Sequence, residues 1–246
     1  MSAWGTAPPK TGFDQEHSDF DKILKLVVVN KGPASQVKYK VLKANVKLLD
    51  AYLAKLTAVP RSEFDKWTRN QQMAFLANAY NAFTMKLIAL HYPVKSIKTI
   101  GGFFSSPWKQ EFFSLWGKKR NLNWIEHGFL RKVYKEPRLH FALNCASIGC
   151  PALRDESYKA RILDQQLDKQ ARRFLSDRSR NYIKDDKLYV SKIFDWYGDD
   201  FVKKYGSVVK FIAKYYTSNE VLKNKIASGK FDLDFPDYNW SLNEYK

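Results

Sequence analysis

A long apolar segment, residues 73–92, constrains the fold of this chain more than any other feature. The preceding Thr68 and Gln71 have the spacing of a capping box, in which each side chain satisfies a backbone amide that the first helical turn leaves free. Apolar residues then occupy nearly every side of the helix, which is typical of a helix buried all round. We therefore predict a central helix, and the 45% of residues that are hydrophobic are enough to surround it with a core.

The predicted central helix also carries a polar stripe. Gln71, Asn78 and Asn81 fall within an arc of about a quarter turn at 3.6 residues per turn. A buried amide without a hydrogen bond costs about 1–3 kcal/mol, so these side chains need polar partners. Two alternatives stay open: the amides hold loop backbone in place, or they line a binding site. We include Asn78 and Asn81 among the candidate binding residues.

The remaining sequence patterns indicate one α+β domain over residues 13–246, after a flexible lead-in at 1–12. Apolar residues at helical spacing predict helices over 20–27, 42–56, 163–174, 194–201 and 208–216, with Gly32-Pro33 and Pro60 beyond the ends of the first two. Hairpins are expected over 112–123 and 182–190, a helix capped by Asn123 over 125–133, and a short strand over 138–143. The expected architecture is a central buried helix packed on a small mixed or antiparallel sheet, with peripheral helices.

The chain is strongly basic, with a formal net charge of +17. Its lysines are scattered and form no block of five, which favours a solvated surface over a specific nucleic-acid partner. No apolar run is long enough to span a bilayer, and the first residues lack the charged and apolar regions of a secretory signal. A cytoplasmic protein and an exported one whose signal has been removed are both consistent with this start.

Chemically useful residues are concentrated between His140 and Cys150. The sequence has no glycine-rich phosphate loop and no H-E-x-x-H zinc motif, and two cysteines do not make a structural zinc site, so we expect neither a cofactor nor a metal. Cys145 and Cys150 form a disulfide in one interpretation. In the other, Cys145 is a reactive thiol.

A thiol nucleophile needs a base, and a third group to orient that base. Five residues of extended strand span about 16 Å, so His140 would not touch Cys145 without a chain reversal. His127, which follows Glu126 on a predicted helix, is free of that constraint. The hypothesis assigns Cys145 as nucleophile and His127 or His140 as base, with Glu126 or an amide of the polar stripe as the orienting group. The alternative is structural: His140 is a core histidine, Glu126 complements a helix dipole, and the cysteines form a disulfide.

Four ordered stretches of the chain carry a recognisable pattern: residues 73–84, 121–131, 138–151 and 193–201. Together they resemble the family catalogued as domain of unknown function 547, and residues 238–243 resemble its terminal motif. The resemblance covers about residues 15–243 and brings no settled activity. Bacterial members often look exported, which implies an oxidising compartment suited to a disulfide. The order of a buried helix and a strand bearing His140 is also similar to papain-like and transglutaminase-like folds, although Gln71 and Gln72 stand where those folds carry the nucleophile.

Two functions follow as hypotheses. The first is a periplasmic or secreted thiol-dependent hydrolase or acyltransferase of papain-like type, acting on a peptide or cell-envelope substrate. The alternative is a non-catalytic binding module for a peptide, a glycan or an acidic polymer, with Cys145–Cys150 as a structural disulfide. Tyr80, Arg138 and Asn144 join the two stripe amides as candidate binding residues.

Overall fold

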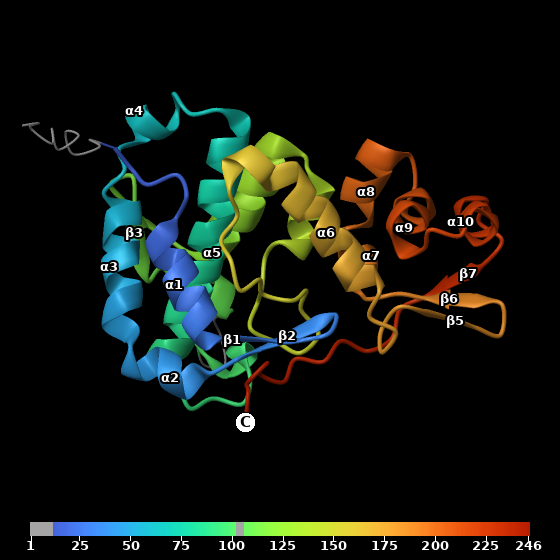
Figure 1. Ribbon diagram of the computed structural model, residues 1–246, viewed down its shortest axis with the longest axis horizontal. Coiled ribbons are helices and arrows are strands. Elements are labelled where there is room, and N and C mark those ends of the chain that lie inside the picture. Colours follow the sequence, from blue (N-terminus) through green and yellow to red (C-terminus); the bar gives the residue numbers. More distant parts are fainter. Residues whose placement is uncertain (1–11, 102–105) are drawn as a thin grey trace, which may run out of the picture.

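Helix α5 (Arg69–His91) runs through the larger of two hydrophobic clusters in a computed structural model, which describes residues 12–101 and 106–246 (Figure 1). The Thr68 hydroxyl accepts from the Gln71 backbone amide, and the Thr68 amide donates to the Gln71 side chain. The predicted capping box is therefore confirmed. Side chains on every face of the helix are buried between Met73 and Ala89, as the apolar pattern predicts.

The first part of the chain packs around the outside of α5 (Figure 1). Residues 42–56 form two helices instead of the predicted one, because the chain leaves helical geometry at Asn45. Gly32 turns a hairpin with a φ of 59°, a conformation that favours glycine. The elements are α1 (Ser18–Val27), β1 (Val28–Lys31), β2 (Ala34–Val37), α2 (Tyr39–Ala44), α3 (Val46–Thr57) and α4 (Arg61–Phe64).

The middle of the chain contains short elements that bring polar side chains to α5. The predicted hairpin over 112–123 is present, and it turns at Trp116-Gly117. A π-helix follows; Asn121, not the predicted Asn123, caps it by accepting from the Trp124 amide at 2.8 Å. The elements are η1 (Ile97–Thr99), η2 (Pro107–Lys109), β3 (Phe113–Leu115), β4 (Lys118–Arg120), η3 (Trp124–Tyr134), η4 (Pro137–Phe141) and η5 (Ala160–Ile162).

The last part of the chain builds the second hydrophobic cluster, beside the first (Figure 1). The predicted hairpin over 182–190 is confirmed, and a further strand pairs with it in parallel to complete a three-stranded sheet. Helix α10 was not predicted. The elements are α6 (Leu163–Leu175), β5 (Tyr182–Lys184), β6 (Lys187–Tyr189), α7 (Ile193–Trp196), α8 (Gly198–Tyr205), α9 (Val208–Tyr216), α10 (Glu220–Ala227) and β7 (Asp232–Asp234).

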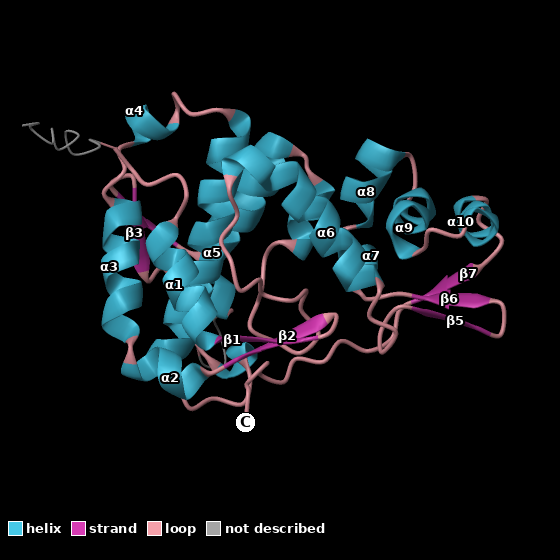
Figure 2. Ribbon diagram, in the orientation of Figure 1, coloured by secondary structure: helices cyan, strands magenta, loops and turns pink. Residues whose placement is uncertain are grey.

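Two expectations about the architecture are wrong. The predicted strand over 138–143 is the 3-10 helix η4, because Pro137 occupies its first turn and the Glu136 side chain accepts from the Arg138 amide. The principal neighbours of α5 are α2, α3, η3 and η5, so helices surround it in place of the expected sheet (Figure 2). The fold is α+β, mostly helical, with small two- and three-stranded sheets. The lead-in at residues 1–11 lies outside the described residues, within which no helix is long and apolar enough to cross a membrane.

Candidate functional site

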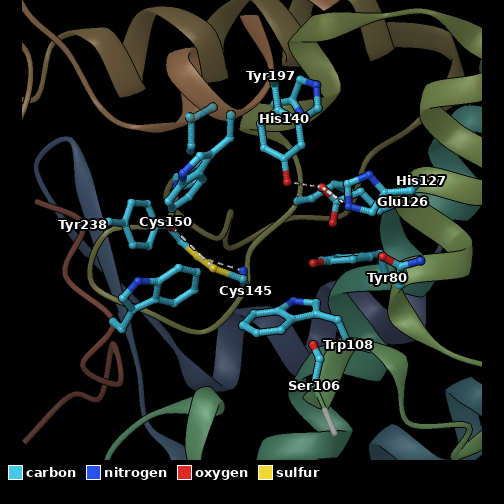
Figure 3. Close-up of a pocket in the computed structure, with 16 residues that line it drawn as sticks. Tyr80, Ser106, Trp108, Glu126, His127, His140, Cys145, Cys150, Tyr197 and Tyr238 are labelled. Atoms are coloured by element: carbon cyan, nitrogen blue, oxygen red, sulfur yellow. Dashed lines mark hydrogen bonds and ion pairs between the residues drawn. A yellow bond between two sulfur atoms is a disulfide. The ribbon is translucent and has the colours of Figure 1, made fainter. Parts of the chain in front are cut away.

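A cavity of about 280 Å³ opens where the two hydrophobic clusters meet (Figure 3). One side is polar and carries Glu126 and the Tyr80 hydroxyl, and Tyr238 stands on the opposite side. The Cys145–Cys150 pair lies between these two sides. Among the described residues, six aromatic side chains line the cavity: Tyr80, Trp108, Trp196, Tyr197, Tyr238 and Trp240.

Glu126 is the central polar group of the cavity. It lies in the first turn of η3, and only 10% of its side chain is exposed. The Tyr197 hydroxyl donates a 2.8 Å hydrogen bond to Glu126 Oε1, and Nε2 of His127 lies 3.8 Å from the same oxygen. The π-helical geometry of η3, which is rare and often found at functional sites, carries both neighbouring residues into one cavity.

The titratable groups around Glu126 are held in their neutral forms. Burial lowers the pKa of His127; the Glu126 charge opposes this shift, and the nearby Arg131 charge adds to it. Burial also raises the pKa of Tyr80 and of Tyr197, and the Glu126 charge raises both further. At neutral pH, the phenols are therefore hydrogen-bond donors, and His127 does not supply a full positive charge to the carboxylate.

His140 reaches the cavity through a hydrogen-bonded stack. Its ring lies against Tyr197 with 3.9 Å between centroids, and its Nε2 is 2.8 Å from Asp200 Oδ2. Arg131 donates to the same carboxylate oxygen at 2.6 Å and places another nitrogen 2.8 Å from Nδ1 of His127. Burial raises the pKa of Asp200, but the hydrogen bonds from His140 and Arg131 outweigh it and hold that pKa well below its usual range. His140 is buried, as the core-histidine alternative expects, and its hydrogen-bond partner is the Asp200 carboxylate.

The opposite wall is built from aromatic residues near the C-terminus. The ring centroids of Trp196 and Trp240 lie 4.9 and 4.6 Å from that of Tyr238, and Trp108 lies 5.7 Å from Trp240. Gly149 permits this packing, because a Cβ at that position would stand 2.7 Å from the Tyr238 ring. The backbone amide of Gly149 also donates to Asn239, which ties the cysteine loop to the aromatic segment.

The cysteine loop closes between the two walls. Cys145 and Cys150 are joined by a disulfide with an S–S distance of 2.12 Å. Asn144 holds the loop from inside: its side chain donates to the Pro151 carbonyl and accepts from the Ala146 amide. Of the two interpretations of the cysteines, the structure contains the disulfide, and Cys145 in this form has no thiolate to offer.

Two members of the polar stripe of α5, Asn78 and Asn81, hold loop backbone, whereas Gln71 belongs to the capping box. Asn78 donates to the Tyr158 carbonyl at 2.8 Å and accepts from the amide of the same residue at 2.9 Å. Asn81 donates to the Ala142 carbonyl and accepts from the Asn144 amide. Neither amide lines the cavity. The stripe thereby positions the loop that carries the disulfide and supports the site from behind.

The structure brings some of the predicted site residues to the cavity and places others elsewhere. Glu126, His127, His140 and Cys145 all line the cavity. Of the candidate binding residues, only Tyr80 lines the cavity. Arg138 instead forms ion pairs with Glu136, Asp164 and Asp168. The aromatic wall was missed, although Trp196, Tyr238 and Trp240 fall inside the two motifs nearest the C-terminus. Within the described residues, no group of three or more His, Cys, Asp or Glu side chains could hold a metal ion.

A match to a known protein family includes some of the residues of this site. Residues 64–175 match the model of a family described as "Protein of unknown function, DUF547". No curated protein and no solved structure matches the chain, and nothing found supports a papain-like fold. The matched segment includes Glu126, His127, His140 and both cysteines, but not the residues after Leu175 that complete the aromatic wall. From α4 to α6, the chain is thus similar to the DUF547 family, whose function is unknown.

Proposed function

We propose that this chain is a non-catalytic binding module whose cavity captures an ammonium group of its ligand. One observation carries the proposal: Glu126 is a nearly buried carboxylate that, within the described part of the chain, has no lysine or arginine nitrogen within 4.0 Å. Arg131, whose charge interacts with Glu126 at longer range, is already paired with Asp200 at 2.6 Å. A buried charge without a counter-charge is costly, so a cationic ligand would supply what the site lacks.

The rest of the cavity suits the same ligand. No lysine or arginine is among the described residues that line it, despite the net charge of +17. The faces of tryptophan and tyrosine attract cations by about 0.5–2 kcal/mol, and more when water is excluded. The aromatic side chains and the Glu126 carboxylate that line the cavity therefore favour an ammonium group over an anion. The shared chemistry covers a lysine side chain, the amino terminus of a peptide and an amino sugar.

The disulfide supports a binding module over a thiol enzyme. A thiol-dependent hydrolase or acyltransferase needs a thiolate at Cys145, and the bond to Cys150 occupies that sulfur. Glu126 is also the only Asp or Glu among the described residues lining the cavity, so a mechanism that uses paired carboxylates lacks its second member.

The proposal is tested by tryptophan fluorescence, because Trp108, Trp196 and Trp240 line the cavity. The probes are Nα-acetyl-lysine amide and, for the amino-terminal source, triglycine amide, with Nα-acetyl-norleucine amide as the uncharged analogue. At least one of the two ammonium probes is expected to bind at least tenfold more tightly than the norleucine probe. This factor corresponds to a difference of about 1.4 kcal/mol in binding free energy. Equal binding of the norleucine probe, or no saturable response to either ammonium probe, would overturn the proposal.

A pair of matched variants assigns the effect to the cavity. Glu126→Gln keeps the shape of the side chain and an acceptor for Tyr197, and it is expected to weaken ammonium binding at least tenfold. Glu220→Gln removes the same charge from an exposed site paired with Lys223, and it should change binding less than twofold. Similar losses in both variants would mean that net charge, and not Glu126, controls the affinity.

A further inference from the structure

A second concavity, of about 830 Å³, lies on the side of the molecule formed by η3, η4 and α8. Its cationic lining, here called the basic groove, consists of Arg69, Arg131, Lys132, Lys135, Lys203 and Lys204. We infer that the basic groove binds an acidic polypeptide segment. This inference does not depend on the ammonium site, although the two concavities share His127, His140 and Leu143 in their walls.

The charges in the groove are far from balanced. Its lining includes two carboxylates, Glu136 and Asp200. Asp200 is already paired with Arg131, and Glu136 with Lys204 and with Arg138 from outside the groove. The acids that line the groove therefore leave a surplus of cations unneutralised.

Three lysines account for most of that surplus. Lys132, Lys135 and Lys203 are exposed, and within the described part of the chain none of them has a carboxylate within 4.0 Å. Arg69 is occupied by a backbone carbonyl: its guanidinium donates to Tyr134 and also lies 5.3 Å from the centroid of that ring. Arg69 forms no ion pair with a carboxylate of the described residues, so its positive charge is not neutralised.

The cations that line the groove come from separate elements. Arg69 begins α5, Lys132 belongs to η3, and Lys203 belongs to α8. Lys135 follows η3 in a left-handed conformation with a φ of 50°, which ends the helix and turns the chain toward Glu136. A ligand with several negative charges can contact more than one of these elements, whereas a single small anion would contact few of them.

The floor of the groove distinguishes between polyanions. Leu130, Leu139 and Leu143 line it, and no described Phe, Tyr or Trp does. Proteins that bind single-stranded nucleic acid combine a basic groove with aromatic rings on which bases stack. An aliphatic floor below a lysine rim instead suits the methylene groups and carboxylates of glutamate side chains. A concave shape also fits an extended segment better than the flat surface of a bilayer.

The test is fluorescence anisotropy with a fluorescein-labelled peptide of ten glutamates, at low and at physiological salt. The variant Lys132→Gln/Lys203→Gln removes two charges from the groove. Its matched control, Lys25→Gln/Lys230→Gln, removes two exposed charges elsewhere, so both proteins fall equally below the net charge of +17. The groove variant is expected to lose at least tenfold in affinity, and the control less than twofold.

Other outcomes would overturn the inference. Equal losses in the two double variants would show attraction by net charge alone. Tighter binding of a labelled ten-residue oligothymidylate would identify a nucleic-acid surface, and absence of peptide binding at low salt would leave no acidic-peptide site. Glu126→Gln should bind the glutamate peptide as the unmodified protein does. Failure of the ammonium proposal is thereby separable from failure of this one.

Discussion

The hydroxyl of Tyr197 donates a 2.8 Å hydrogen bond to Glu126, joining residues that are 71 positions apart in the sequence. The same tyrosine ring stacks on His140 at 3.9 Å. This single side chain therefore connects the C-terminal hydrophobic cluster to both η3 and η4. It also explains why a nearly buried carboxylate is held in one orientation toward the cavity.

Removing the Tyr197 hydroxyl should destabilise the protein while the aromatic ring stays in the cavity wall. Tyr197→Phe keeps the ring that stacks on His140, but it takes away a hydrogen bond to a charged acceptor, worth about 1.5–3 kcal/mol. We expect a loss of that size in the free energy of unfolding by urea. Tyr245→Phe is the matched control, because Tyr245 is 38% exposed and its hydroxyl has no hydrogen bond to the described residues. A change below 0.5 kcal/mol is expected there, and an equal loss in both variants would contradict the prediction.

Gly149 should control the position of the aromatic wall. A Cβ there would stand 2.7 Å from the Tyr238 ring, so Gly149→Ala must displace that ring or the cysteine loop. We expect a loss of about 1–3 kcal/mol in stability and a weaker fluorescence response to the lysine probe. Gly198→Ala places its Cβ 3.8 Å from Val208, an ordinary contact, and should leave both measurements nearly unchanged. A variant Gly149→Ala with unaltered stability and response would show that Tyr238 does not need its present position.

Stability should fall in acid partly because of Glu136. Burial raises its pKa, but hydrogen bonds from Arg138 and Lys204 outweigh burial and lower that pKa to about 2 from an ordinary 4.5. The folded state therefore binds this proton less readily than the unfolded state. Its stabilising contribution, at most about 3 kcal/mol, is complete above pH 4.5 and is lost as the pH falls toward 2.

Urea unfolding between pH 7 and pH 2 checks this dependence. Glu136→Gln should flatten the decline below pH 5 and should lower stability at pH 7, because it leaves the buried side of Arg138 with less counter-charge. Glu220→Gln, at an exposed residue, should keep the pH profile of the unmodified protein. If Glu136→Gln retained the full acid-induced decline, other carboxylates would have to account for it.

The disulfide should be quantitative in protein purified without reductant. Alkylation after denaturation, followed by mass spectrometry, should then find no free thiol at Cys145 or Cys150. Because the closed loop is short, Cys145→Ala/Cys150→Ala should lower stability by only about 2 kcal/mol on the loop-entropy account. A free Cys145 thiol that is alkylated in the native protein, with a low pKa that depends on His127 or His140, would restore the thiol-enzyme hypothesis.

Features that local hydrogen bonding and periodicity control could be predicted from the amino-acid order alone. Helix α5 and its capping box depend on residues within one or two turns, and the hairpin at Gly117 depends on a conformation that glycine adopts readily. The chemical character of Glu126, His127, His140 and Cys145 also pointed to residues that line the cavity. These inferences needed no knowledge of distant contacts.

The surroundings of those residues depend on long-range contacts that form when the chain folds. An apolar run such as 138–143 fits a strand or a helical turn equally well. Its 3-10 geometry follows from Pro137 and the Glu136 cap, and the ion pair of Glu136 with Lys204 joins that turn to α8. The role of Asn81, holding loop backbone or lining a binding site, was open in the sequence; the structure shows that it donates to the Ala142 carbonyl. Trp240 reached the cavity only because the C-terminal segment crosses the cysteine loop. Such contacts join residues far apart in the sequence, and no local pattern specifies them.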